Sequence, residues 1–197
     1  MLTIPMADGT VMQRQVLGFD DRTVQIDGVD RVVPAIQMDN FNLYDDPHDF
    51  YSSVTSIFYS YSTLREYLTT TIQGMENPEF IKCLGSSKVT TMEAANGTKS
   101  VVYDKLFAPA MVEMGLKYSN YTAKQEEVEG PTPTLYDRYH DSTRKTRGGI
   151  TARYWTRSAM LANTTYRLIV NYDGLGYISG LHNKNYVLAQ FNFIGKY

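Results

Sequence analysis

Three Asp-Gly or Asn-Gly pairs that interrupt strand-like sequence constrain the fold of this chain more than any other feature. They are Asp27–Gly28, Asn96–Gly97 and Asp173–Gly174. A tight type I′ hairpin turn needs positive φ at both central residues, and these pairs adopt it with little strain. Around the first pair, apolar and polar residues alternate over 11–38, as in strands with one buried face. The chain is therefore expected to build a mainly antiparallel sheet.

Between residues 62 and 84 the pattern changes to that of two short helices. Apolar residues recur at helical spacing over 64–72, and Ser62 or Thr63 precedes them in a position to cap the first helix. The second helix begins at Asn77, an expected N-cap that is followed by a proline at the first helical position. The expected fold class is α+β: a twisted, mainly antiparallel sheet with two short helices.

The size and charge of the chain narrow the class of protein. Its 197 residues suit a single domain over 1–197, and a net charge of −2 gives no overall field that would attract nucleic acid or an anionic membrane. The single cysteine, Cys83, excludes intrachain disulfides. No apolar run is long enough to span a bilayer, and the N-terminus lacks the features of a signal peptide. We expect a protein that is made in the cytosol and has no membrane partner.

The most polar part of the chain is 116–149, which contains the sequences GPTPT and RGG. We expect it to form a long surface excursion, so that deleting 120–148 would leave a folded domain. Basic residues cluster at its end and beyond, namely Arg138, Arg144, Lys145, Arg147, Arg153 and Arg157. Asp137 and Asp141 dilute this charge, and no nucleic-acid module signature accompanies it. A solvated or inter-subunit loop is favoured over a contact with nucleic acid.

Trp155 and Arg157 lie two residues apart in an apolar strand-like segment. On a strand, such residues share a face. One interpretation is that Trp155 fills the core and Arg157 hydrogen-bonds nearby carbonyls or a carboxylate, a task that suits its five fixed donors. The other is that Arg157 clamps a ligand. We favour the structural interpretation for both residues.

Acidic and histidine residues form two clusters that raise the question of metal binding or acid–base chemistry. One contains Asp45, Asp46, His48 and Asp49, and the other contains Asp137, His140 and Asp141. The first lacks the glycine and spaced acids of an EF-hand loop, which favours a solvated acidic loop. The second has no nucleophile beside it. Because the chain also lacks the short motifs of hydrolases, zinc proteases and phosphate-binding loops, we expect no enzyme activity, no metal and no cofactor.

Sixteen tyrosines accompany a single tryptophan, and tyrosine suits both strands and binding surfaces. The best binding candidates gather near the C-terminal strands; they are Tyr166, Tyr172, Tyr177, His182, Asn183, Asn185 and Tyr186. Tyrosine and asparagine combine stacking area with adaptable hydrogen bonds. The alternative is that half of these residues simply face the core as alternate members of strands.

Six segments, in the same order, resemble a domain family known as DUF6273, which occurs mainly in phage structural proteins and carries a WWLRSP-type motif. Tyr154–Ala159 (YWTRSA) is similar to that motif, with tyrosine in place of the first tryptophan. The other five are VLGFDD with IQMDN at 16–21 and 36–40, STLREYL at 62–68, YDKLF with EMG at 103–107 and 113–115, VNYDG at 170–174, and FNFI at 191–194. Over 186–191 the chain lacks the arginine and proline usual in the family. The resemblance covers 12–194.

The resemblance implies a setting and a fold rather than a reaction. The Trp-Arg-Ser strand, the strand pair after it and the closing strand also resemble C-type lectin-like folds, a family that includes phage receptor-binding domains. By resemblance, we expect a non-enzymatic virion protein that decorates the capsid, neck or tail through contacts with other virion proteins or with copies of itself. The alternative is a glycan- or receptor-binding adhesion module at a tail or fibre tip. A third interpretation is an enzyme that acts on surface polysaccharide.

Overall fold

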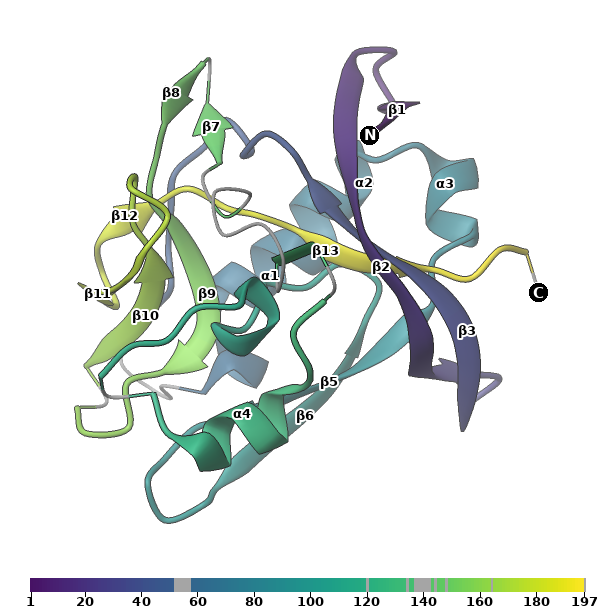
Figure 1. The fold of residues 1–197 in the computed structure, drawn as a ribbon. Helices are drawn as coiled ribbons and strands as arrows, with labels where there is room; N and C mark the ends of the chain where they lie inside the picture. The colour runs from purple at the N-terminus through teal and green to yellow at the C-terminus, as the bar shows by residue number, and fades with distance from the viewer. Residues whose placement is uncertain are drawn as a thin grey trace.

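A long, twisted hairpin forms one end of the molecule in the computed structural model (Figure 1). The structure describes residues 1–51, 58–119, 121–133, 135–136, 143, 145–147, 149–163 and 165–196. The hairpin consists of β2 (Val11–Ile26) and β3 (Val29–Asn40), which pair along most of their length. Asp27 and Gly28 join them with φ of 51° and 77°. The predicted hairpin is therefore confirmed, with positive φ at both turn residues.

The hairpin is the centre of a larger sheet with the order β13-β3-β2-β5-β6, in which β1 also pairs with β2. The added strands are β1 (Leu2–Pro5), β5 (Ser86–Met92), β6 (Lys99–Asp104) and β13 (Gln190–Phe193). All of these pairings are antiparallel. Asn96–Gly97 lies in the turn between β5 and β6, as predicted, and Gly97 has a φ of 91°. Asp8–Gly9, which we did not predict as a turn, joins β1 to β2.

A second, three-stranded sheet lies at the other end of the molecule, with the order β11-β10-β9 (Figure 1). Its strands are β9 (Tyr154–Ala159), β10 (Tyr166–Val170) and β11 (Gly176–Gly180). Asp173–Gly174 turns the chain between β10 and β11, which confirms the third predicted hairpin. Two short antiparallel pairs complete the strands, and they join β4 (His48–Asp49) to β12 (Lys184–Asn185) and β7 (Thr146–Arg147) to β8 (Ile150–Thr151).

The first predicted helix is a continuous helical segment with a π-helical middle. After a 3₁₀ turn, η1 (Tyr59–Tyr61), the segment runs through α1 (Thr63–Tyr67), η2 (Leu68–Ile72) and α2 (Gln73–Met75). The side chain of Ser62 accepts a hydrogen bond from the backbone N–H of Arg65 at 3.1 Å, so Ser62 and not Thr63 is the N-cap. The second helix, α3 (Pro78–Lys82), begins at Asn77 as predicted.

The expected surface excursion over 116–149 is wrong for the residues that the structure describes there. A third helix, α4 (Ala123–Glu129), forms after a capping box between Thr122 and Gln125, and it follows the 3₁₀ turn η3 (Val112–Met114). Fully or almost fully buried residues in this stretch include Tyr121, Gln125, Glu129, Tyr136, Thr143 and Lys145. Their polar groups bond to other buried groups, as when Gln125 Nε2 donates to the carbonyl of Ala159 at 2.9 Å. The polar composition of 116–149 therefore reflects buried hydrogen bonds as well as solvent.

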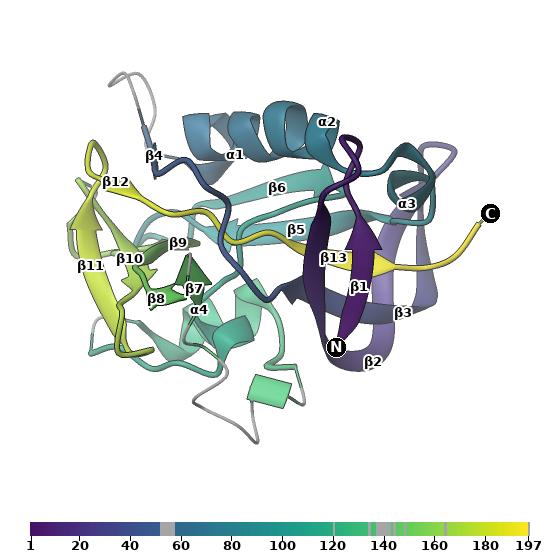
Figure 2. The ribbon, with the colours of Figure 1, turned by 90° about the horizontal axis from the view of Figure 1, so that it is seen from above.

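The helices cover the two faces of the β5–β6 hairpin. Figure 2 shows the segment from α1 to α2 lying along one side of β5 and β6, with α4 toward the other side. Arg65 on α1 forms a bidentate ion pair with Asp104 of β6 at 2.7 and 2.8 Å. On the other side, Glu129 of α4 accepts a hydrogen bond from the backbone N–H of Met92 at 3.1 Å. The arrangement is α+β and mainly antiparallel.

The core divides into two apolar clusters. The first lies beneath the α1–α2 segment and includes Leu64, Leu68, Ile72, Trp155 and Phe191. The second surrounds β10 and includes Met111, Tyr136, Tyr154, Leu168 and Val170. Tyr154 and Trp155 enter different clusters because successive side chains of a strand point to opposite faces. Among the described residues, no helix is both long and apolar enough to cross a membrane.

Candidate functional site

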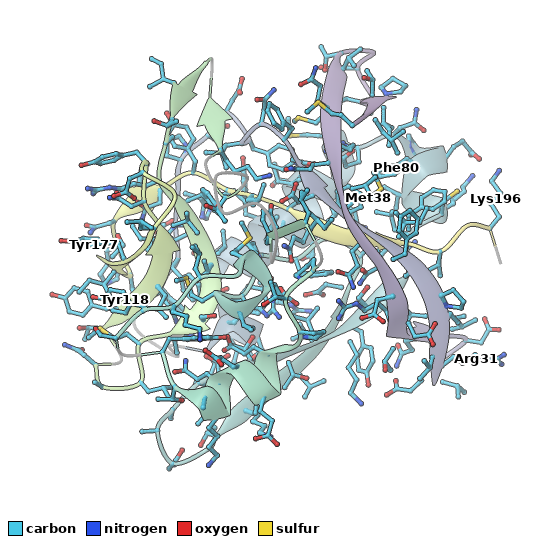
Figure 3. The ribbon with its side chains drawn as sticks, in the orientation of Figure 1. Arg31, Met38, Phe80, Tyr118, Tyr177 and Lys196 are labelled. Atoms are coloured by element: carbon cyan, nitrogen blue, oxygen red, sulfur yellow. The ribbon has the colours of Figure 1, made fainter. Side chains whose placement is uncertain are left out.

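Exposed tyrosines flank an arginine at the β10–β11 turn. The side chains of Tyr172 and Tyr177 are 54% and 50% exposed. The guanidinium carbon of Arg153 lies 5.4 Å from the ring centroid of Tyr172 and 5.9 Å from that of Tyr177. Arg153 Nε also donates to Asn171 Oδ1 at 2.7 Å. We call these four residues the aromatic surface; Figure 3 shows Tyr177 pointing outward from it.

The other predicted binding residues do not join the aromatic surface. Tyr166, also partly exposed, pairs with Gly180 and so lies at the opposite end of the β10–β11 hairpin from Tyr172. His182 and Asn183 are exposed in the turn after β11, at the same end of the hairpin as Tyr166. Five of the seven predicted residues are thus divided between the two ends of one hairpin.

Two of the seven residues are withdrawn from the surface. Asn185 is buried, and its Nδ2 donates to Ser179 Oγ at 3.0 Å. Tyr186 is half-buried and packs against the second core cluster. For these two residues, the alternative interpretation as inward-facing members of the strands agrees with the structure.

Trp155 occupies the core, as the structural interpretation requires. Its side chain is fully buried, and its ring packs edge-on against Phe50 with centroids 5.5 Å apart. The indole Nε1 donates to the carbonyl of His48 at 2.6 Å. This bond satisfies the one polar atom of the side chain, so the indole enters the core without an unpaired donor.

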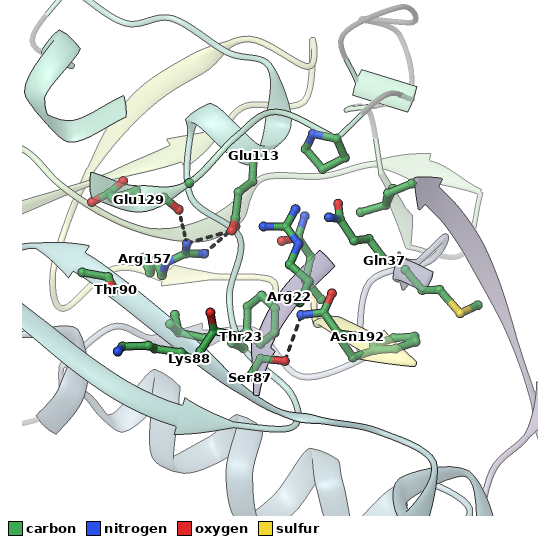
Figure 4. A pocket seen from close by; sticks show the side chains of 18 of the residues that line it. Arg22, Thr23, Gln37, Ser87, Lys88, Thr90, Glu113, Glu129, Arg157 and Asn192 are labelled. Carbon is green, nitrogen blue, oxygen red and sulfur yellow. Dashed lines mark hydrogen bonds and ion pairs between the residues drawn. The ribbon is translucent and has the colours of Figure 1, made fainter. Parts of the chain in front are cut away.

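Arg157 is also buried, and it binds both a carboxylate and carbonyls. Its terminal nitrogens donate to the two oxygens of Glu113 at 2.5 and 2.9 Å. They also donate to the carbonyls of Ala108 and Glu129, each at 2.9 Å. Figure 4 shows the bonds of Arg157 to Glu113 and Glu129. Burial acts to lower the pKa of Arg157, but the charge and hydrogen bonds of Glu113 together with the charge of Glu129 outweigh it and raise the pKa overall. The planar fork of arginine is what allows all four bonds to form at once.

Glu129 connects this ion pair to α4. Its carboxylate accepts hydrogen bonds from the backbone of Met92, from the hydroxyl of Tyr121 at 2.8 Å and from the hydroxyl of Ser158. Burial raises the pKa of the Glu129 carboxyl, against the opposing effects of Arg157 and of these hydrogen bonds. The arrangement is a buried polar network that holds β9, η3 and α4 together.

Three further buried ion pairs were not predicted from the sequence. They are Arg14–Glu76, Lys145–Asp39 and Arg167–Glu93. Burial raises the pKa of the Asp39 carboxyl and lowers the pKa of the Lys145 amine. No spacing motif could have found these pairs, because their members lie 62, 106 and 74 residues apart.

Of the two acidic clusters, the structure describes only the one around His48, and it shows no metal centre there. His48 stacks on Tyr67 with ring centroids 4.5 Å apart, and its Nδ1 lies 3.3 Å from Asp49 Oδ1. Among the described residues, no group of three His, Cys, Asp or Glu side chains could hold a metal ion. Asp137, His140 and Asp141 lie outside the described residues, as do Arg138 and Arg144 of the basic cluster.

The fold and the buried network define a mainly antiparallel α+β domain. The family model described as "Domain of unknown function (DUF6273)" matches residues 37–187, which is most of the chain. The chain belongs to this family, and the family resemblance drawn from the sequence segments is confirmed. No curated protein matches the chain. No solved structure matches it either.

Proposed function

We propose that this domain is a non-enzymatic structural protein of a phage particle, which decorates the capsid, neck or tail through protein–protein contacts. The aromatic surface supports this proposal more than any other feature. Tyrosine and arginine are enriched where protein interfaces bind most strongly. Here the guanidinium carbon of Arg153 lies within 6 Å of the centroids of both exposed rings. Partners would be other virion proteins or further copies of the chain in a symmetric array.

The aromatic surface is ordered before a partner arrives. Arg153 is held by Asn171 and lies over both rings, so its side chain loses little further freedom on binding. A stable contact needs about 800 Å² of buried area per partner. We propose that the rest of this area comes from neighbouring parts of the β9–β11 sheet.

The phage setting rests on the resemblance of the six sequence segments to a family that occurs mainly in phage structural proteins. Within that setting, we propose that the chain is made in the host cytoplasm and then incorporated into the virion. A C-type lectin-like architecture is part of the same proposal, supported by the order of the Trp155 strand, the β10–β11 hairpin and the closing strand β13.

The second candidate function is a glycan- or receptor-binding adhesion module at a tail or fibre tip. It is favoured by the opposite end of the β10–β11 hairpin, where partly exposed Tyr166 pairs with Gly180 and exposed His182 and Asn183 follow in the next turn. An aromatic face beside hydrogen-bonding side chains suits a sugar as well as a protein. The two candidates use different ends of the same hairpin, so separate variants can distinguish them.

Mass spectrometry of purified particles, with stoichiometry, tests the first proposal. We expect the chain at a fixed copy number, and we expect the double variant Tyr172→Ala/Tyr177→Ala to fold but to be depleted from particles. Tyr61→Ala is the matched control, because Tyr61 is 72% exposed on a different part of the surface. A chain that is absent from particles contradicts the structural proposal. Binding on a glycan array that Tyr166→Ala abolishes would favour the adhesion module.

A further inference from the structure

A polar cavity of about 270 Å³ lies between the large sheet and the Arg157–Glu113 ion pair (Figure 4). Pockets for drug-sized ligands span about 300–1,000 Å³, so this cavity suits a smaller molecule. It is remote from the aromatic surface, since β2, β3 and β13 supply one wall while β10 and β11 lie at the other end of the molecule (Figure 1). A ligand here would therefore be independent of the proposed contact surface.

Strand register places three hydrogen-bonding side chains on the wall formed by the sheet. Gln37 of β3 lies directly opposite Asn192 of β13, so their side chains project from the same face. Arg22 of β2 pairs with Val33 of β3, which lies four residues before Gln37. Residues an even number apart on a strand point to the same face, so the side chains of Arg22 and Gln37 share one face of the sheet. All three residues line the cavity, and Figure 4 shows them around a common space.

These side chains have unused hydrogen-bonding capacity. Arg22 Nε is buried and has no partner among the described residues. Gln37 is only 5% exposed, and no group in the described part of the chain pairs with its side-chain amide. Asn192 Nδ2 donates to Ser87 Oγ at 2.8 Å, a bond that fixes the amide and leaves its oxygen to accept. Buried polar groups in proteins are normally paired. Of the six buried side-chain atoms that lack a partner in the described part of the chain, two, Arg22 Nε and Arg157 Nε, belong to residues that line this cavity, which can therefore offer a bound molecule unpaired donors.

The charges around the cavity indicate which kind of partner. Arg157 is neutralised by Glu113, and Lys88 pairs with Asp30 at 2.8 Å. Two further carboxylates line the cavity: that of Glu129, which accepts hydrogen bonds from Met92, Tyr121 and Ser158, and that of Asp21, which is exposed to water. Among the described residues, Arg22 pairs with Asp20, whose carboxylate lies 3.8 Å from a terminal nitrogen of Arg22 and whose side chain is 53% exposed to water. An exposed carboxylate at that distance competes weakly. Arg22 therefore retains a guanidinium fork with the geometry to bind a carboxylate in a bidentate manner.

We propose that this cavity binds a small acidic sugar. Arg22 binds the carboxylate, and the amides of Gln37 and Asn192 bind ring hydroxyls. Amides both donate and accept, which matches the dual character of a hydroxyl. Phe107 and Phe191 also line the cavity and give the ring an apolar contact.

Titration of the isotope-labelled intact chain, followed by NMR, tests the proposal with glucuronate, glucose and acetate as probes. We expect glucuronate to shift the Arg22 Nε–H and Gln37 side-chain resonances. We expect its affinity to exceed that of glucose, which lacks the carboxylate, and that of acetate, which lacks the ring, by at least about tenfold. If glucuronate leaves both resonances unmoved, or if glucose or acetate binds as tightly, the proposal is wrong.

The variant Arg22→Gln should weaken glucuronate binding by about tenfold or more, because it removes the fork and the charge. Arg31→Gln is the matched control. It is the same substitution at an exposed position of the same hairpin, outside the cavity (Figure 3). Equal binding by the Arg22→Gln and Arg31→Gln proteins would overturn the assignment. If Arg22→Gln does not fold, the proposal is tested by whether glucuronate shifts the Arg22 Nε–H resonance of the wild-type protein. None of these outcomes depends on incorporation into particles, so this test and that of the proposed function can fail separately.

Discussion

The carboxylate of Glu113 binds both terminal nitrogens of Arg157, at 2.5 and 2.9 Å, while Arg157 itself is 1% exposed. The pair joins β9 to the 3₁₀ turn η3, across 44 residues of sequence. An arginine in the middle of a fully buried strand is thus explained by a partner from another part of the chain. Breaking such a pair leaves a buried charge without compensation.

Arg157→Lys should lower the free energy of unfolding by about 3 kcal/mol without abolishing partner binding. Lysine keeps the charge, but it cannot reach Glu113 and the carbonyls of Ala108 and Glu129 together. Denaturant titration measures the change, and Arg31→Lys, an exposed substitution of the same kind, should change the value by less than about 0.5 kcal/mol. Unchanged stability with lost binding would assign Arg157 to a ligand instead.

Trp155 should report folding directly, because it is the only tryptophan of the chain and is fully buried. We expect a blue-shifted native emission that moves to the red in denaturant. Trp155→Ala should cost about 3–5 kcal/mol, from lost burial and the cavity left behind. Native emission like that of free tryptophan would contradict the packing against Phe50.

The Glu129 carboxyl should make stability depend on pH. Burial raises its pKa in the folded protein above the ordinary value of 4.5, so the folded state holds this proton more tightly than the unfolded state. Its contribution to stability is therefore complete below pH 4.5 and is lost as the pH rises through the raised pKa. Glu129→Gln cannot titrate, so the wild type should gain stability relative to the variant as the pH falls through this range. Denaturant titrations of both proteins at several pH values measure this difference, and a difference that does not vary with pH would contradict the assignment.

Deletion of 120–148 with a short Gly-Ser bridge should unfold the domain. The deletion removes Gln125, Glu129 and Lys145, and it leaves Asp39 buried without its cation. This expectation reverses the one drawn from the sequence, because the polar residues of the segment bond inside the protein. Circular dichroism during heating measures it, and a cooperative transition in the deletion protein would show that the segment is dispensable.

The turns could be predicted because their causes are local. Asp27–Gly28 needs only its own φ preference and the alternation around it, and Asn77 caps α3 through its own side chain. Helix α4 could also have been predicted, because its capping box consists of Thr122 and Gln125, which are three residues apart in the sequence. It was not predicted because the polar composition of this stretch indicated a loop.

The sites depend on register between distant strands, which sequence does not display. Tyr172 and Tyr177 were named as binding candidates, whereas Arg153 was seen only as part of a basic run. The cavity was missed entirely, because Gln37 and Asn192 become neighbours only when β13 pairs with β3. Composition indicated which kinds of residue to consider, and tertiary pairing decided which of them lie together.

The pairing of β13 with β3 also means that one edge of β3 stays unpaired until the end of the chain has been synthesised. Strand β3 receives β2 on one side as soon as the hairpin is made, but its other edge waits for β13. Asp39 and Gln190, which pair across these strands, are about 150 residues apart, and a ribosome needs roughly 8–30 s to cover that length. During this interval the edge beside Ile36 and Met38 is open to foreign strands. We therefore expect a chaperone to bind the nascent chain of this domain until β13, its closing strand, leaves the ribosome.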